Sequence, residues 1–69
     1  MKEKIIKNNV YTLRSERGVT QQDFADAIGV TRQTIIAIEK GNYTPSVLLA
    51  LQIAQYFKKP VEEIFQITK

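Results

Sequence analysis

Glycine and hydroxyl side chains divide this chain into short segments. Its three glycines each follow a stretch with helical apolar spacing, at Gly18, Gly29 and Gly41. A glycine in the left-handed conformation ends a helix at little cost. After each glycine the next segment begins with a residue that caps helix N-termini, at Thr20, Thr31 and Ser46. Short helices joined by tight turns are therefore the expected fold.

This pattern predicts five helices and an all-α fold class. The expected helices cover residues 9–17, 21–28, 32–40, 47–58 and 61–64. One helical face at the start of the chain carries Ile6, Val10, Leu13 and Arg17. Pro60 presets the first turn of the last helix.

The two ends of the chain are richer in β-forming residues. Residues 4–7 and 65–68 are short, and the second segment alternates apolar and polar side chains. We expect the N- and C-termini to pair as a short two-stranded antiparallel ribbon. The alternative is that both ends are frayed.

The composition excludes several classes of function. With 69 residues the chain is too short for two ordinary domains, so residues 1–69 are interpreted as a single domain. It has no cysteine and no histidine, which removes thiol chemistry and the commonest metal ligand and general base. The carboxylate pairs Asp23 with Asp26 and Glu62 with Glu63 have no nucleophile beside them. We therefore expect no catalytic residues, no metal, no cofactor and no small-molecule ligand.

Charge and hydropathy bear on partners and location. Ten Lys and Arg against seven Asp and Glu give a net charge of +3, which favours an anionic partner without deciding its kind. The chain has no apolar run long enough to span a bilayer and no signal peptide. A cytoplasmic protein with no membrane partner is expected.

Residues 21–40 carry the pattern of a helix-turn-helix motif. Phe24 and Ile28 form the inner face of its first helix, and Ile35 and Ile38 form that of its second. The small Ala25 lies where two helices crossing at about 90–120° come closest. Val30 fills the turn between the two helices. Gly29 occupies the first position of this turn, where a positive φ is expected.

The outward face of the second motif helix has the chemistry to read bases. This face carries Arg32, Gln33, Ile36, Ala37 and Lys40. An arginine binds guanine O6 and N7 with two hydrogen bonds, and a glutamine binds adenine N6 and N7 in the same way. Ile36 and Ala37 are short enough for close approach and for contact with a thymine methyl group. Taken alone, such a polar face is more often a solvated surface; the whole motif favours DNA.

Residues 10–65 resemble the helix-turn-helix domain of the phage Cro and repressor family. The resemblance rests on Leu13-Arg14, Val19-Thr20-Gln21, Ala25, Gly29-Val30-Thr31-Arg32-Gln33-Thr34-Ile35, Ile38-Glu39-Lys40-Gly41 and Tyr43-Thr44-Pro45-Ser46. It implies a five-helix domain like that of lambda repressor, which binds operator DNA as a homodimer in a bacterial or phage setting, on the nucleoid. Ala37 departs from the family, which often has Asn or Gln there.

The resemblance also implies roles for single residues. Gln21 would donate to a DNA phosphate and brace the start of the recognition helix. Arg14 and Glu39 would form a partly buried ion pair between helices; the alternative is two separate surface charges. The loop at residues 41–45 would place backbone N–H groups on a phosphate. The full set expected at DNA is Gln21, Thr31, Arg32, Gln33, Thr34, Ile36, Ala37, Lys40, Asn42 and Tyr43. For Tyr43 the alternative is core packing, and Arg17 is either a further phosphate contact or a solvated helix end.

The helix at residues 47–58 is apolar nearly all round, and so small a domain cannot bury every apolar side chain. We expect Leu51, Ala54 and Phe57 in the core. A dimer interface is expected at Thr44, Leu48, Val61, Ile64 and Phe65.

The sequence therefore favours a DNA-binding transcriptional repressor that binds a near-palindromic operator as a homodimer. The alternative is an antitoxin-like module that binds another protein. Salt separates the two, because phosphate contacts weaken binding steeply as salt rises and a hydrophobic contact does not. A membrane-surface role for the lysine-flanked Ile5 and Ile6 is disfavoured, since the segment is too short for a strong amphipathic helix.

Overall fold

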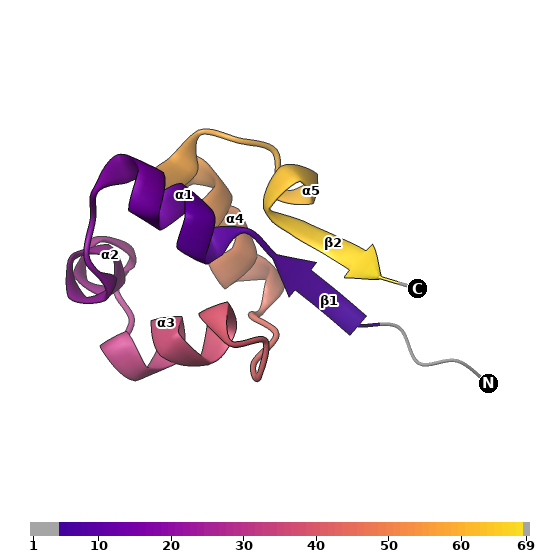
Figure 1. The fold of residues 1–69 in the computed structure, drawn as a ribbon, viewed down its shortest axis with the longest axis horizontal. Helices are drawn as coiled ribbons and strands as arrows, with labels where there is room; N and C mark the ends of the chain where they lie inside the picture. The colour runs from indigo at the N-terminus through magenta and orange to yellow at the C-terminus, as the bar shows by residue number, and fades with distance from the viewer. Residues whose placement is uncertain (1–4, 69) are drawn as a thin grey trace.

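The fold is a bundle of five helices from which a two-stranded ribbon projects (Figure 1). The computed structural model describes residues 5–68. In chain order the elements are β1 (Ile5–Asn8), α1 (Val10–Arg17), α2 (Gln21–Ile28), α3 (Arg32–Glu39), α4 (Val47–Phe57), α5 (Val61–Ile64) and β2 (Phe65–Thr68). The predicted all-α class with a small terminal ribbon is confirmed.

The helices begin where the hydroxyl caps predict. The hydroxyl of Thr20 accepts from the Asp23 backbone N–H at 3.0 Å, and that of Thr31 accepts from Thr34 N–H at 3.3 Å. Ser46 accepts from Leu49 N–H at 3.1 Å. Each bond satisfies a helix N–H group that has no partner within the helix. These contacts fix the first residues of α2, α3 and α4.

The turn between α2 and α3 depends on Gly29. Its φ of 78° lies in the left-handed region, which a side chain on Cβ disfavours. This conformation lets Val30 N–H donate to the Ala25 carbonyl at 3.0 Å and redirects the chain into α3. The glycine thereby sets the angle between the two motif helices.

Three helix boundaries differ from the prediction by one residue. α1 begins at Val10, with Asn9 as its N-cap. α3 ends at Glu39 with Lys40 as its C-cap, and α4 ends at Phe57 because Lys58 adopts a left-handed φ of 57°. A lysine in that conformation gives no signal in the sequence. Ile6 lies in β1 and not on the face of α1, so the helical spacing that joined it to Val10 was accidental.

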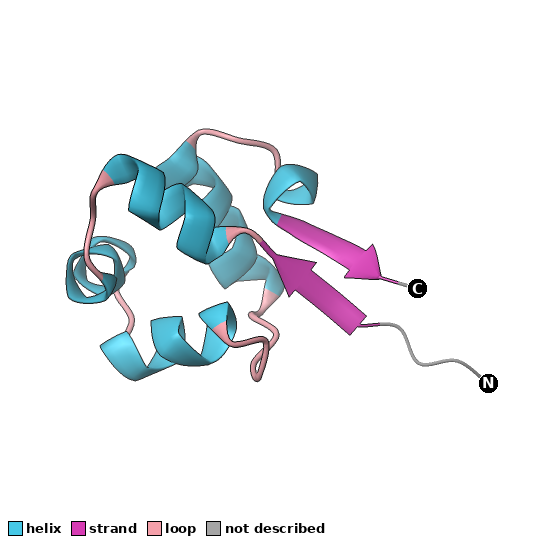
Figure 2. Ribbon diagram, viewed as in Figure 1, coloured by secondary structure: helices cyan, strands magenta, loops and turns pink. Residues whose placement is uncertain are grey.

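The ribbon joins the two ends of the described chain. β1 and β2 are antiparallel, with Ile6 opposite Ile67 and Lys7 opposite Gln66 (Figure 2). Lys4, which the prediction included in the first strand, lies outside the described residues. The side chain of Asn8 donates to the Ile38 carbonyl at 2.9 Å, so the ribbon is held against the end of α3.

The core lies between the helices and contains the predicted motif residues. Phe24, Ala25, Ile35 and Ile38 are fully buried, and Ile28 and Val30 pack against them half-buried. Ile53, Ile64 and Val10 complete the fully buried set. Ala54 and Phe57 are buried as predicted, but Leu51 is 49% exposed. The prediction for Leu51 was wrong because this residue lies at the surface, beside Pro60 and Val61.

Candidate nucleic-acid interface

One side of α3 is built into the core and the other is open to solvent. Ile35 and Ile38 are fully buried, whereas Arg32, Gln33 and Lys40 are exposed. The other outward residues, Thr34, Ile36 and Ala37, are half-buried. The helix is therefore fixed by its apolar side while its polar side is free to meet a ligand.

An ion pair ties α1 to the last residue of α3. Arg14 Nε donates to Glu39 Oε2 at 2.7 Å, and Arg14 Nη2 donates to Glu39 Oε1 at 3.2 Å. The side chains are only 12% and 6% exposed. A third donor of Arg14, Nη1, binds the Val19 carbonyl at 2.9 Å. Hydrogen bonding with Glu39 raises the pKa of the Arg14 guanidinium above its ordinary value, so the arginine stays charged.

Gln21 connects this pair to the start of α3. Its amide nitrogen, Nε2, donates to Glu39 Oε1 at 3.1 Å. Its amide oxygen, Oε1, accepts from Arg32 Nε at 3.4 Å. Gln21 therefore contacts both the first and the last residue of α3. The resemblance implied only the contact at the start of that helix.

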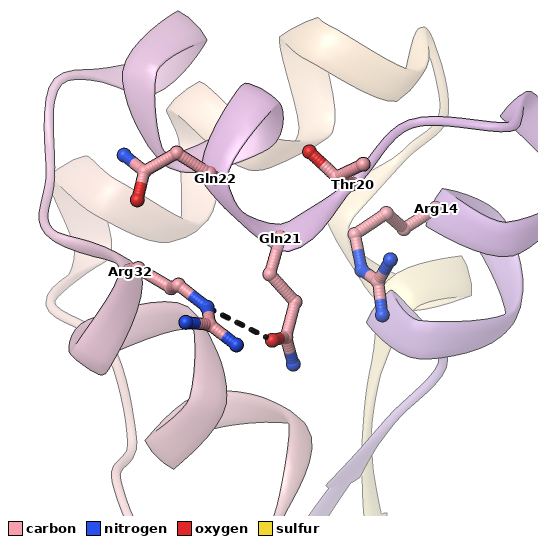
Figure 3. A pocket seen from close by; sticks show the side chains of 5 residues that line it. All are labelled: Arg14, Thr20, Gln21, Gln22 and Arg32. Carbon is pink, nitrogen blue, oxygen red and sulfur yellow. Dashed lines mark hydrogen bonds between the residues drawn. The ribbon is translucent and has the colours of Figure 1, made fainter.

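A shallow hollow opens beside this network (Figure 3). The residues that line it are Arg14, Thr20, Gln21, Gln22 and Arg32. Two are cationic, three are neutral hydrogen-bonding residues, and none of the five carries a carboxylate. Gln21 lies between the two arginines, with its bond to Arg32 drawn as a dashed line. Because Arg14 is already paired with Glu39, the charge of Arg32 is what favours an anion over a cation in the hollow.

The remaining candidate contacts lie at the ends of α3. Thr31 and Thr34 place their hydroxyl oxygens 3.1 Å apart at its N-terminus, where both also take part in the cap. Asn42 is exposed in the following loop, and Tyr43 is 46% exposed. Tyr43 is therefore not one of the buried core residues.

Arg17 is exposed at the end of α1, and its side chain also contacts α4. Its Nη1 atom donates to the Tyr56 carbonyl at 2.9 Å, and its guanidinium lies 4.9 Å from the centre of the Tyr56 ring. Arg17 thus anchors α1 to the end of α4. Arg17 is therefore a solvent-exposed helix end, as one of the two alternatives held, with an added contact to α4 that the sequence did not indicate.

A second surface of the bundle is apolar. Thr44 and Leu48 are exposed, and the half-buried Val61 and Phe65 line one groove with Thr44. Ile64 is fully buried in its own chain, so its assignment to a dimer interface was wrong. The short α5 turns Ile64 inward to the core and leaves its neighbours at the surface.

The same surface includes residues that the sequence did not indicate. Val47 is 77% exposed, and Ile67 on the ribbon is 67% exposed. A groove brings the ribbon together with the start of α4 and is lined by Ile6, Thr44, Pro45, Val47, Ala50, Val61 and Phe65. The ribbon residues could be found only once the pairing of the two termini was known. We call the exposed and half-buried residues Ile6, Thr44, Val47, Leu48, Leu51, Val61, Phe65 and Ile67 the apolar face.

Comparison with known families matches this arrangement. A family model described as helix-turn-helix matches residues 10–64, most of the chain. The chain belongs to the helix-turn-helix family of the Cro and repressor type. An uncharacterized HTH-type transcriptional regulator of Bacillus subtilis, YgzD, is 48% identical over 60 residues, which are 87% of this chain and 91% of YgzD.

Other helix-turn-helix proteins resemble the chain more distantly. The transcriptional repressor RstR of the cryptic phage CTXphi, from Vibrio cholerae, is 30% identical over 60 residues, which are 87% of this chain and 54% of RstR. The restriction-modification controller protein C.AhdI of Aeromonas hydrophila has the same fold, with a TM-score of 0.72, 24% identity and 80% of each chain covered. The relatives place the chain among HTH-type transcriptional regulators.

Residues 5–68 contain neither a membrane-spanning helix nor a metal-binding cluster. No helix there has both the length and the apolar character needed to cross a bilayer. Within the same residues, no cluster of carboxylates is arranged to hold a metal ion.

Proposed function

We propose that this protein is a sequence-specific transcriptional repressor that places α3 in the major groove of an operator. The observation that carries the proposal is the division of α3 into a buried side, with Ile35 and Ile38, and an open side that begins with Arg32 and Gln33. A helix held in this way enters a groove without exposing the core. The guanidinium of Arg32 and the amide of Gln33 then meet the base edges.

Arg32 and Gln33 are the proposed base-reading residues. Arg32 uses Nε to contact Gln21, which leaves both Nη groups for the O6 and N7 acceptors of a guanine. Gln33 is exposed and has the donor and acceptor that adenine requires. The half-buried Ile36 and Ala37 fit a thymine methyl group, and the alanine side chain has no hydrogen-bonding atom.

The phosphate contacts are proposed around both ends of α3. One amide hydrogen of Gln21 binds Glu39, and the second is available to a phosphate at the hollow beside Arg32. The Thr31 and Thr34 hydroxyls flank the same end of the helix. At the other end, Lys40, Asn42 and Tyr43 are exposed and offer donors of their own.

The apolar face is the proposed contact between two copies of the chain. Its exposed Val47, Leu48 and Ile67 would otherwise remain in water, and burial of such side chains favours association. A two-fold dimer presents two copies of α3 about 34 Å apart, which suits half-sites one helical turn apart in a near-palindromic operator. Repression is proposed from the similarity to RstR, and this role places the protein in the cytoplasm.

Selection from random oligonucleotides with the purified protein tests this function. We expect an enriched near-palindrome whose half-site centres are about 10 base pairs apart. Selection of no sequence above background would overturn the proposal. The alternative, a module for another protein partner, predicts that outcome together with a monomer whose apolar face is free.

A further inference from the structure

A continuous chain of hydrogen bonds runs from α1 to the exposed end of α3. Arg14 donates to Glu39, Gln21 Nε2 donates to Glu39, and Arg32 Nε donates to Gln21 Oε1. Glu39 is the last residue of α3 and Arg32 is the first. A carboxylate at one end of the helix is thereby connected to an arginine at the other.

The chemistry of each link dictates the next. An ionised carboxylate accepts hydrogen bonds and donates none, so Glu39 requires the NH₂ end of the Gln21 amide. The amide oxygen must then face the opposite way, toward Arg32. A guanidinium donates and never accepts, so Arg32 requires that oxygen. If the Gln21 amide turned over, both of its bonds would be lost at once.

We propose that Glu39 is a positioning residue for base reading: through Gln21 it holds the guanidinium of Arg32 ready for a base. This inference rests on the proposed function and extends it to a residue whose side chain is only 6% exposed and which is not among the proposed DNA contacts. With its Nε engaged by Gln21, Arg32 loses less conformational freedom when its Nη groups bind.

The ion pair with Arg14 is part of the same device. Arg14 places its positive charge next to the Glu39 carboxylate, with Nε 2.7 Å from Oε2. It also fixes the carboxylate, since two of its bonds come from one planar guanidinium. Glu39 therefore has a role in specificity beyond its structural contact between α1 and α3.

Glu39→Gln tests the proposal, because a glutamine keeps the shape but no longer dictates the orientation of the Gln21 amide. The first measurement is the ratio of affinities for the selected operator and for an operator changed at the base pair whose preference Arg32→Ala relaxes. We expect Glu39→Gln to lower this ratio by about three- to tenfold, the value of one hydrogen bond. In the Arg32→Ala background the same change should lower it no further.

Two further variants separate positioning from stability and charge. Glu16→Gln makes the same change of charge at an exposed position of α1 and should leave the ratio unchanged. Gln21→Met keeps the Arg14–Glu39 pair and breaks the chain at its middle, so it should lower the ratio even if Glu39→Gln does not fold. All ratios are compared below the melting temperature of every variant, as followed by circular dichroism.

The outcomes distinguish a failure of the positioning role of Glu39 from a failure of the proposed DNA-binding function. An unchanged ratio in folded Glu39→Gln, or in Gln21→Met, overturns the positioning role while sequence-specific binding stands. A ratio that Glu39→Gln lowers equally with and without Arg32 also overturns it, because the effect would not pass through Arg32. If Arg32→Ala relaxes no base preference at all, base reading by Arg32 fails and the inference fails with it.

Discussion

Arg32 is the residue whose chemistry most directly links this structure to base recognition. It is exposed at the first position of α3, and its Nε bond to Gln21 leaves four Nη–H donors. We expect Arg32→Ala to weaken operator binding by about 1–3 kcal/mol and to relax the preference at one position in each half-site. Titrations against a panel of single-base operator variants measure both effects. An equal loss for every sequence would instead make Arg32 a phosphate contact.

Lys40 has a different expected signature because it follows the last turn of α3 and is exposed. A phosphate contact contributes to affinity without regard to sequence. We expect Lys40→Ala to weaken binding to all sequences alike and to reduce the slope of log affinity against log salt by about one. Lys58→Ala removes the same charge from the end of α4 and serves as the control. A slope unchanged in Lys40→Ala would remove this residue from the interface.

Single residues also show the limits of reading the sequence. The outward position of Arg32 and Gln33 follows from helical spacing alone. The bond from Gln21 to Glu39 does not, because these residues are 18 positions apart and their contact depends on how α2 crosses α3. Arg17 was ambiguous for the same reason, since its partner Tyr56 is 39 positions away.

At the scale of elements, the partly buried ion pair ties the end of α3 to α1. Arg14→Met leaves the 6% exposed Glu39 carboxylate without its charged partner. We expect a loss of about 3–5 kcal/mol in the free energy of unfolding, which is a large part of the stability of so small a domain. Urea denaturation followed by circular dichroism measures this loss.

The double variant Arg14→Met with Glu39→Met is the matched control. It removes both charges and fills the site with apolar side chains of similar length, which is often neutral or stabilising. We expect it to regain most of the stability that the single variant loses. A single variant as stable as the original protein would mean that solvent screens the pair despite its burial.

Elements were predictable where their signals are local. The hydroxyl caps at Thr20, Thr31 and Ser46 each bond to the residue three positions on, so the starts of the helices could be read from neighbouring letters. The end of α4 could not, because Lys58 adopts a positive φ that its own side chain disfavours, in a turn where Lys59 N–H donates to the Ala54 carbonyl.

At the scale of the whole molecule, the apolar face joins segments from both halves of the chain. The sequence indicated that α4 has more apolar residues than one copy can bury. It could not show that Ile6 and Ile67, brought opposite each other by the ribbon, extend the same surface. It also placed Ile64 at this surface, since the facing of a four-residue helix is decided by the elements around it.

The dimer is best tested at Leu48, which is 69% exposed and so can be changed without disturbing the core. Val61 also lies on the apolar face, but it packs against the core cluster, so Val61→Asp would affect folding and association together. We expect Leu48→Asp to fold normally and to sediment as a monomer, because a dimer would bury its carboxylate without a partner. Analytical ultracentrifugation measures the mass of the species.

Loss of the dimer should lower the affinity for the full operator. A monomer engages one half-site at a time, so Leu48→Asp should bind the full operator no more tightly than an isolated half-site. Gln52→Asp introduces the same charge at an exposed α4 position outside the apolar face and should remain dimeric. If Leu48→Asp still sediments as a dimer, the two copies meet through another surface, and the apolar face must be assigned to a different protein partner.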